Sequence, residues 1–132
     1  NVRQLSCGMT DLACDSITEP FEGDVEQFEV ASMAPTQVLP VVPGTAMAPA
    51  FGHIFSGGYA AGYYGYKWAE VLEADAFSLF KEKGIFNREV SGSFRENILS
   101  KGGTEHPMEL YVRFRGHKPE TKALIEKMGL GK

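Results

Sequence analysis

The most informative stretch of this chain is Phe51–Trp68, FGHIFSGGYAAGYYGYKW, which holds one histidine, a Gly-Gly pair and four tyrosines. On an α-helix that begins near Gly58, each residue advances by about 100°, so the side chains of Tyr59, Tyr63 and Tyr66 fall within an arc of about 60°. The three phenols then share one face, whereas Tyr64 and Trp68 lie with apolar residues on the opposite face. The pattern predicts a helix that separates an apolar core from a polar cleft.

Tyrosines at helical spacing also have an ordinary explanation, because such residues commonly pack in a core. Two observations favour a functional role here. Glycines stand at positions 57, 58, 62 and 65 among the tyrosines, although each costs about 1 kcal/mol in a helix interior. His53 lies just upstream, on a segment expected to be a loop that can fold over the phenolic face. We therefore interpret the segment as one side of a binding cleft.

The rest of the chain predicts an all-α fold of about six helices with one long central helix and a proline-rich extended loop. Asp24 and Asn87 are suitable N-caps, Gly84 is a suitable C-cap, and proline at the first helical position favours helix starts. Only Val38–Val42 resembles a strand, confined to an edge by its proline. The expected helices cover 2–14, 24 to the proline at 35, 58–83 and 87–100, followed by two short helices that open at Pro107 and Pro119.

Composition limits the classes of function. The 132 residues are 43% hydrophobic, which is typical of a globular domain, and 132 residues predict one domain. The net charge of −4 argues against nucleic acid or an anionic membrane as a partner. A mild basic cluster at residues 113–118 is expected to be a solvated helix end. No apolar run approaches the roughly 18 residues of a membrane span.

The two cysteines, Cys7 and Cys14, are expected to be buried free thiols. On one helix, residues seven apart are separated by about 10 Å, which is too far for a disulfide bond. Few cysteines in an ordinary domain are typical of a reducing compartment, so we expect a cytoplasmic location.

The tyrosine segment resembles the C-terminal catalytic segment of the thimet oligopeptidase (M3) family of zinc metallopeptidases. Members carry Phe-x-His, Gly-Gly-Tyr, Tyr-Tyr-x-Tyr and a tryptophan, which stand here at 51–53, 57–59, 63–66 and Trp68. The likeness continues at Ala34–Gln37, Gly84–Asn87 and Arg113–Gly116, and so covers nearly the whole chain. The three residues between His53 and Gly57 resemble the bacterial branch, which includes oligopeptidases and peptidyl-dipeptidases.

The resemblance implies that the chain belongs to a larger, mostly helical catalytic domain that uses zinc to hydrolyse short peptides. Tyr66 matches a position that stabilises the transition state, so it is the candidate catalytic residue. A set of further positions matches residues that contact the substrate, namely His53, Gly57, Gly58, Tyr59 and Tyr63.

The zinc motif of that family is absent from this sequence. A catalytic zinc site needs three or more suitable ligands, commonly His-Glu-x-x-His on a helix. The three histidines stand instead in HIFSG, HPMEL and HKPET. We therefore expect residues 1–132 to be the C-terminal part of the catalytic domain, with zinc held upstream in the parent and none bound by this piece.

Two hypotheses of different class follow. In the first, the chain is part of an oligopeptidase or peptidyl-dipeptidase, inactive alone and able to self-associate through apolar surface that the rest of the parent domain normally covers. In the second, it is an independent helical module that binds peptides without catalysis. A scaffold in which the phenols merely pack is a third, weaker reading.

Overall fold

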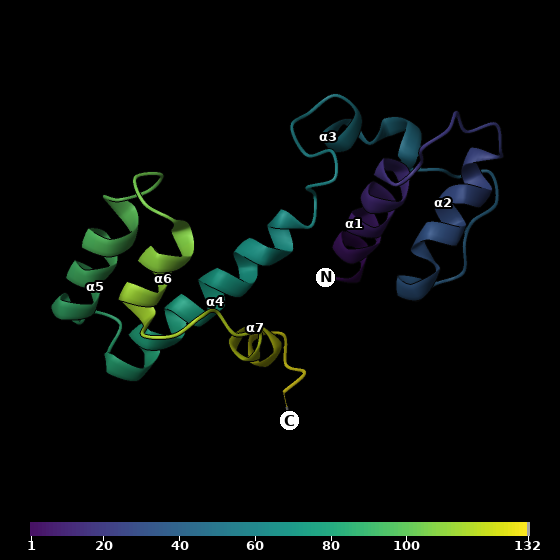
Figure 1. Ribbon diagram of the computed structural model, residues 1–132. Helices are drawn as coiled ribbons and strands as arrows, with labels where there is room; N and C mark the ends of the chain where they lie inside the picture. Colours follow the sequence, from purple (N-terminus) through teal and green to yellow (C-terminus); the bar gives the residue numbers. More distant parts are fainter. Residues whose placement is uncertain (132) are drawn as a thin grey trace. The chain divides into compact units, whose positions relative to one another are not determined.

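The computed structural model describes residues 1–131, in which helices are joined by turns and loops (Figure 1). Within those residues there is no strand, so the predicted all-α class is confirmed. Contacts divide the chain into two compact units, Asn1–Lys67 and Trp68–Lys132. The boundary falls in the first turn of helix α4 (Gly65–Lys83), so the tyrosine segment lies in the first unit except for its last residue, Trp68.

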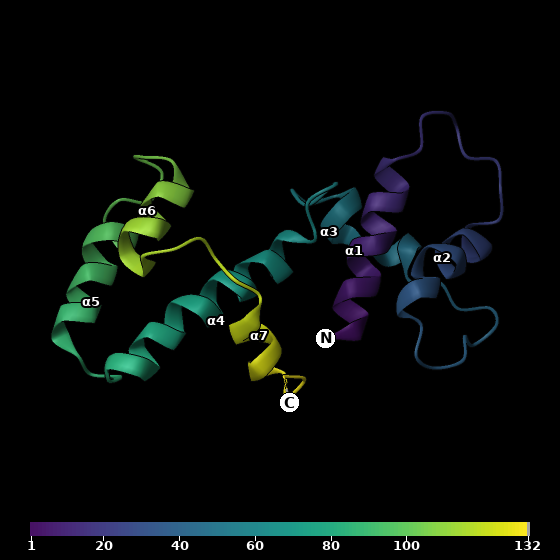
Figure 2. The ribbon, with the colours of Figure 1, turned by 60° about the horizontal axis from the view of Figure 1, so that its bottom comes forward.

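In the first unit, helices α1 (Val2–Asp15) and α2 (Val25–Met33) pack side by side (Figures 1 and 2). Small hydroxyl side chains join these helices and the 3-10 turn that follows α2. Ser6 Oγ lies 2.7 Å from Thr36 Oγ1, and Thr10 Oγ1 lies 3.1 Å from Ser32 Oγ. Each buried hydroxyl group thereby gains a hydrogen-bond partner, which its burial requires.

The apolar core of this unit is small. Cys7 of α1 packs with Phe51 and Ile54, and the half-buried Met47 and Tyr63 cover them. Phe51 precedes the one-turn helix α3 (Gly52–Phe55), which follows the 3-10 helix Ala48–Ala50. The core therefore fixes α3, which carries His53, against α1.

The second unit is built around α4, α5 (Arg88–Phe94) and α6 (Pro107–Arg115). A π-helical turn, Arg95–Leu99, extends α5, and α7 (Lys122–Lys127) follows α6. One apolar cluster of this unit consists of Ala76, Val90, Tyr111 and Phe114, with half-buried phenylalanines against it. Burying each large apolar side chain contributes about 1.5–3 kcal/mol.

A buried ionic group lies in the same unit. Asp75 is 3% exposed, and its Oδ2 accepts a hydrogen bond from the Tyr111 phenol at 2.6 Å. Arg115 Nε lies 3.6 Å from Asp75 Oδ1 and donates to the Asp75 carbonyl oxygen at 3.0 Å. Burial and this hydrogen bond raise the pKa of the Tyr111 phenol, which keeps it a donor. The expectation that the basic cluster is a solvated helix end is therefore wrong for Arg115.

The predicted local signals at helix ends are largely confirmed. Asp24 accepts the Gln27 N–H at 2.9 Å, and Asn87 accepts the N–H groups of Glu89 and Val90. Gly84 follows α4 with a φ of +106°, and Pro107 opens α6. Side chains that satisfy the first free N–H groups of a helix act locally, so sequence reveals them.

Other boundaries and orientations were wrong. The stretch Val38–Val42 forms no strand, and α7 begins at Lys122 rather than at Pro119. Both cysteines are free as expected, but only Cys7 is buried, while Cys14 is half-buried. Several large apolar side chains on the helices are exposed, among them Leu5, Leu12, Val25 and Leu99.

Candidate functional site

Four predicted site residues bring their rings together in the first unit: His53, Tyr59, Tyr63 and Tyr66, which we name the ring cluster. The Tyr59 and Tyr66 rings are stacked with centroids 4.8 Å apart, and the Tyr63 and Tyr66 centroids are 5.3 Å apart. The His53 ring centroid lies 5.7 Å from those of Tyr59 and Tyr63 and 6.2 Å from that of Tyr66. One imidazole and three phenols therefore form a single polar-aromatic group.

The predicted helix from Gly58 is wrong, although the phenols still gather. The α-helical hydrogen bonding of α4 begins at Gly65, and residues 56–64 form turns and bends, here named the tyrosine loop. Of the three clustered tyrosines, only Tyr66 lies on α4. Ala61 has a φ of +52°, which breaks helical continuity between Tyr59 and Tyr63. Folding of the loop, rather than helical spacing, brings Tyr59 and Tyr63 to Tyr66.

His53 owes its position to buried neighbours on either side of it in the sequence. Phe51 and Ile54 are buried in the core, so the intervening His53 side chain is left exposed toward the tyrosines. The Phe51 ring also meets the Tyr63 ring edge-on, with centroids 5.1 Å apart. The predicted loop histidine thus lies on a one-turn helix and faces the predicted phenols.

The Gly-Gly pair has two different environments. A Cβ at position 57 would lie 2.8 Å from the His53 carbonyl oxygen, so the backbone turn itself requires glycine there. No atom lies within 4 Å of a Cβ built on Gly58. Gly57 therefore shapes the loop, and Gly58 leaves open space beside Tyr59.

Two acidic residues that the sequence analysis did not identify hold the tyrosine loop. Asp11 of α1 is fully buried, and its Oδ1 and Oδ2 accept the N–H groups of Ala61 at 3.0 Å and Tyr63 at 2.9 Å. Asp15, one turn later and exposed, also accepts the Ala61 N–H at 2.8 Å. No local sequence pattern signals these bonds, because they join residues about fifty positions apart.

A third acidic residue holds the backbone just upstream of α3. Glu29 of α2 is 8% exposed, and both of its carboxylate oxygens accept the Met47 N–H at 2.8 Å. It also accepts the Ala48 N–H. The stretch that carries the ring cluster is thus anchored by buried carboxylates upstream of His53 and within the tyrosine loop.

The surroundings of two phenols favour their protonated form. A side-chain hydrogen bond with Tyr59 is the main cause that raises the pKa of the Tyr66 phenol, and partial burial adds to it. Burial raises the pKa of the Tyr63 phenol, and the neighbouring Cys7 thiol adds to the increase. Since an ordinary phenol has a pKa of about 10, both groups remain hydrogen-bond donors at neutral pH.

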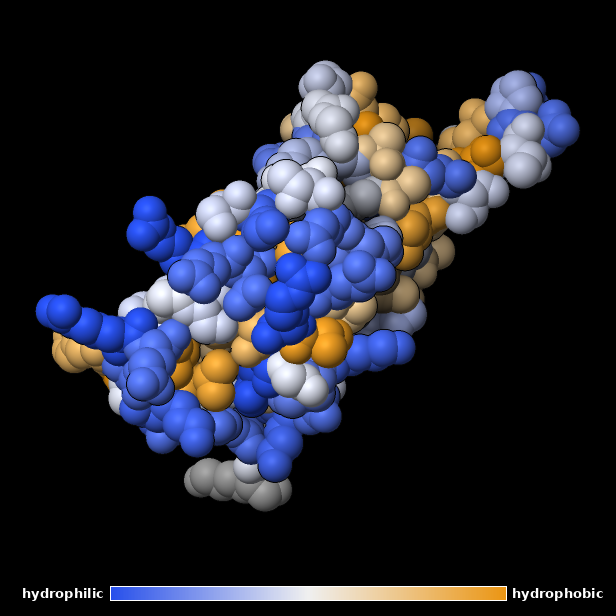
Figure 3. Space-filling view, turned by 60° about the vertical axis from the view of Figure 1, so that its left-hand side comes forward, coloured by the Kyte–Doolittle hydropathy of each residue, from blue (hydrophilic) through white to orange (hydrophobic). Residues whose placement is uncertain are grey.

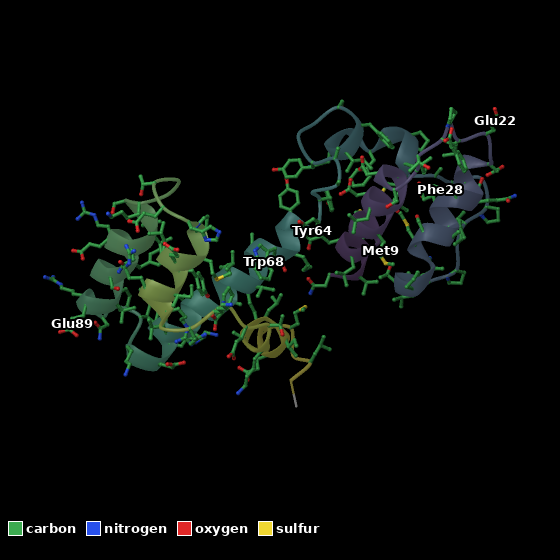
Figure 4. All side chains as sticks on the ribbon, viewed as in Figure 1. Met9, Glu22, Phe28, Tyr64, Trp68 and Glu89 are labelled. Atoms are coloured by element: carbon green, nitrogen blue, oxygen red, sulfur yellow. The ribbon has the colours of Figure 1, made fainter. Side chains whose placement is uncertain are left out.

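The residues expected on the opposite, core-facing side are more exposed than predicted. Tyr64, immediately before α4, is 57% exposed, and Trp68 on its first turn is 47% exposed (Figure 4). Tyr64 lies outside the ring cluster. It has the same phenol group as the three clustered tyrosines but different surroundings.

Residues 1–131 do not supply a metal site. No three His, Cys, Asp or Glu side chains in this range converge to hold a metal ion. His106 caps α6 by accepting the Met108 N–H at 3.2 Å, and His117 Nδ1 lies 2.7 Å from the Lys118 carbonyl oxygen. In the same range, no helix is both long enough and apolar enough to cross a membrane.

Comparison with known proteins agrees with the resemblance. The family model described as peptidase family M3 matches residues 1–130. Oligopeptidase A of Escherichia coli is 47% identical over 130 residues, which are 98% of this chain and 19% of that protein. Dipeptidyl carboxypeptidase of the same organism is 42% identical over 108 residues, or 81% of this chain and 16% of that protein. The chain belongs to peptidase family M3.

Relatives from plants extend the comparison. A protein named probable cytosolic oligopeptidase A, from Arabidopsis thaliana, is 39% identical over 135 residues, covering 98% of this chain and 19% of that protein. The chain therefore spans about a fifth of the length of the curated relatives that it matches.

Proposed function

We propose that this chain is the C-terminal part of the catalytic domain of a peptidase that hydrolyses short peptides, as an oligopeptidase or a peptidyl-dipeptidase. The ring cluster is the observation that carries the proposal. It sets three phenols and an imidazole side by side, and its glycine-bordered edge leaves room beside Gly58. Such a surface can donate hydrogen bonds to the carbonyl groups of an extended peptide.

Tyr66 is the proposed catalytic residue. When water attacks a peptide carbonyl group, negative charge develops on the carbonyl oxygen. A phenol O–H at about 2.7–3.1 Å from that oxygen stabilises the charge, and the loss of one such donor typically lowers the rate about 10²–10³-fold. The raised pKa of the Tyr66 phenol supports this role, because the group keeps its proton at neutral pH.

The other members of the site are proposed to bind substrate. Tyr59 and Tyr63 flank Tyr66, and His53 can donate to the peptide backbone. Gly57 and Gly58 lack side chains, so a peptide backbone can approach the loop closely. Binding and catalysis are thereby assigned to adjacent groups on α3, the tyrosine loop and the first turn of α4.

The zinc ion that the family implies is proposed to be held by parts of the parent protein outside this chain. Its chemistry is to activate the attacking water. The described residues do not fit the ion, since no cluster of ligands forms among them. The chain's own contribution is to bind and orient the peptide and to donate a hydrogen bond from the Tyr66 phenol to the developing oxyanion.

The gene upstream of the Asn1 codon separates the enzyme from the independent binding module. We expect an in-frame His-Glu-x-x-His in the same open reading frame, because the relatives are about five times longer than this chain. DNA sequencing of that region checks the expectation. A start codon directly before Asn1, with no coding sequence upstream, would support the module instead.

The rest of the parent domain is the proposed partner of the second unit's surface. This unit has a groove of about 720 Å³. Figure 3 shows hydrophobic residues exposed among hydrophilic ones on one face of the molecule. Large apolar surfaces of this kind favour association. The groove is lined mainly by apolar side chains, among them Leu72, Phe77, Phe80, Phe94 and Met108.

The isolated chain is therefore expected to form dimers or higher oligomers, which light scattering measures. Phe77→Ser should weaken association, because Phe77 lines the groove and is 41% exposed. Phe86→Ser is the matched control, since Phe86 is 95% exposed and outside the groove lining. A clean monomer at high concentration would contradict the expectation.

We also place the parent enzyme in the cytoplasm. The free cysteines support this location, as does the name of the cytosolic relative from Arabidopsis thaliana.

A further inference from the structure

We infer that Asp11 is a positioning residue for catalysis: its buried carboxylate holds the tyrosine loop in the shape that presents Tyr63 and Tyr66 to the substrate. The inference rests on the function proposed above for the ring cluster. Asp11 lies on α1, outside the Phe51–Trp68 segment that carries the ring cluster.

The energetics of burial make Asp11 dependent on the loop. Its side chain has no solvent exposure, and within residues 1–131 no lysine or arginine forms a salt bridge with it. A buried charge is costly unless hydrogen bonds or an opposite charge compensate it. Here the compensation comes from the N–H groups of Ala61 and Tyr63, one for each carboxylate oxygen. Bonds of this charge-assisted kind are about twice as strong as neutral ones.

The loop in turn depends on Asp11. Ala61 has a φ of +52°, a left-handed conformation that is uncommon and strained for a residue with a Cβ. Such strain persists only where the surroundings enforce it. The Ala61 N–H is directed at two carboxylates, those of Asp11 and Asp15, which are the groups that enforce this conformation.

A short chain of bonds links Asp11 to the catalytic phenol. Asp11 fixes the Tyr63 N–H, and the Tyr63 carbonyl oxygen accepts the Tyr66 N–H at 3.2 Å. The Tyr63 ring also lies 5.3 Å from the Tyr66 ring. A shift of the loop therefore moves Tyr63 directly and removes a support of Tyr66. Misplacement by about 1 Å can cost about 10²-fold in rate.

The test uses Asp11→Asn in the full-length, zinc-loaded parent enzyme. Asparagine keeps the shape but loses the charge, and its NH₂ group faces one of the two N–H donors instead of accepting from it. We expect kcat to fall about tenfold or more, with full zinc content and unchanged helical circular dichroism. Asp24→Asn is the matched control: Asp24 also accepts a backbone N–H, but it caps α2 and lies outside the ring cluster, so kcat should stay unchanged.

A double-mutant cycle shows whether Asp11 acts through the phenol. In a Tyr66→Phe background, Asp11→Asn should lower kcat by a much smaller factor than in the wild-type enzyme, because both changes remove the same interaction. Equal factors in the two backgrounds would overturn the inference. If Tyr66→Phe itself is silent, the proposed function fails; if Tyr66→Phe is damaging while Asp11→Asn is silent, only the role of Asp11 fails.

Ala61→Gly separates positioning from stability. In an Asp11→Asn enzyme, glycine at 61 relieves the backbone strain, so thermal stability should recover while kcat stays low. Recovery of kcat to the wild-type value would overturn the inference, because the phenol would then be positioned without the Asp11 carboxylate. Amide hydrogen exchange of the wild-type enzyme gives an independent check that needs no variant. The Ala61 and Tyr63 amides should exchange slowly, and rapid exchange of both would contradict the anchor.

Discussion

Tyr66→Phe in the full-length parent enzyme is expected to lower kcat by about 10²-fold or more while KM changes little. The substitution removes one hydroxyl group and leaves the ring stacked on Tyr59. A donor that acts mainly on the transition state contributes to kcat rather than to substrate binding. Steady-state kinetics on a fluorogenic peptide, with zinc content measured in parallel, checks the result.

Tyr64→Phe is the matched control for this prediction. Tyr64 carries the same hydroxyl group two positions earlier, but it is 57% exposed and lies outside the ring cluster. Its loss should be nearly silent. His53→Ala should fall between the two, raising KM and lowering kcat, because His53 is proposed to bind the substrate backbone.

The comparison between Tyr64 and Tyr66 decides the assignment of the site. Equal damage to kcat from Tyr64→Phe and Tyr66→Phe, in stable and zinc-loaded enzymes, would show that the ring cluster is not the reacting face. The proposed oxyanion contact would then fail with it.

The second large effect is expected from the 132-residue chain itself, which should show no peptidase activity and no stoichiometric zinc. Residues 1–131 contain no converging set of three metal ligands, and the sequence has no His-Glu-x-x-His. The ring cluster is proposed to bind and polarise a peptide, but it offers no activated water. Metal analysis of the purified chain and turnover of the same fluorogenic peptide measure both quantities.

One tightly bound zinc ion per chain, together with peptide turnover, would contradict this prediction. It would mean that self-association or a ligand arrangement unlike the one described builds an active centre from this segment. The full-length enzyme, assayed at equal concentration, serves as the positive control.

Several structural features were predictable because their causes are local. Asp24 and Asn87 cap helices through N–H groups two or three residues away, and Pro107 has no N–H to satisfy at the start of α6. The all-α class follows from the same signals. Exposure is less predictable from local signals: Leu99 is apolar but 67% exposed.

The ring cluster was predictable from the sequence in part only. Spacing correctly predicted that Tyr59, Tyr63 and Tyr66 gather, but it assumed a helix that the structure does not contain. The glycines that flagged the segment as unusual also signalled that a continuous helix is unfavourable there. A positive φ at Ala61 then redirects the chain, and no propensity scale predicts that for alanine.

The sequence by itself determined the all-α class, most helix ends, the family and the identities of the rings in the candidate site. Only the tertiary structure decided how those rings meet, because the deciding bonds join distant residues. Asp11 accepts the N–H of Ala61, fifty positions away in the tyrosine loop. Asp75 on α4 contacts Tyr111 and Arg115 of α6. A buried charge needs hydrogen-bond or ionic partners, and the tertiary fold decides which residues those are. The periodicity of the sequence does not indicate them.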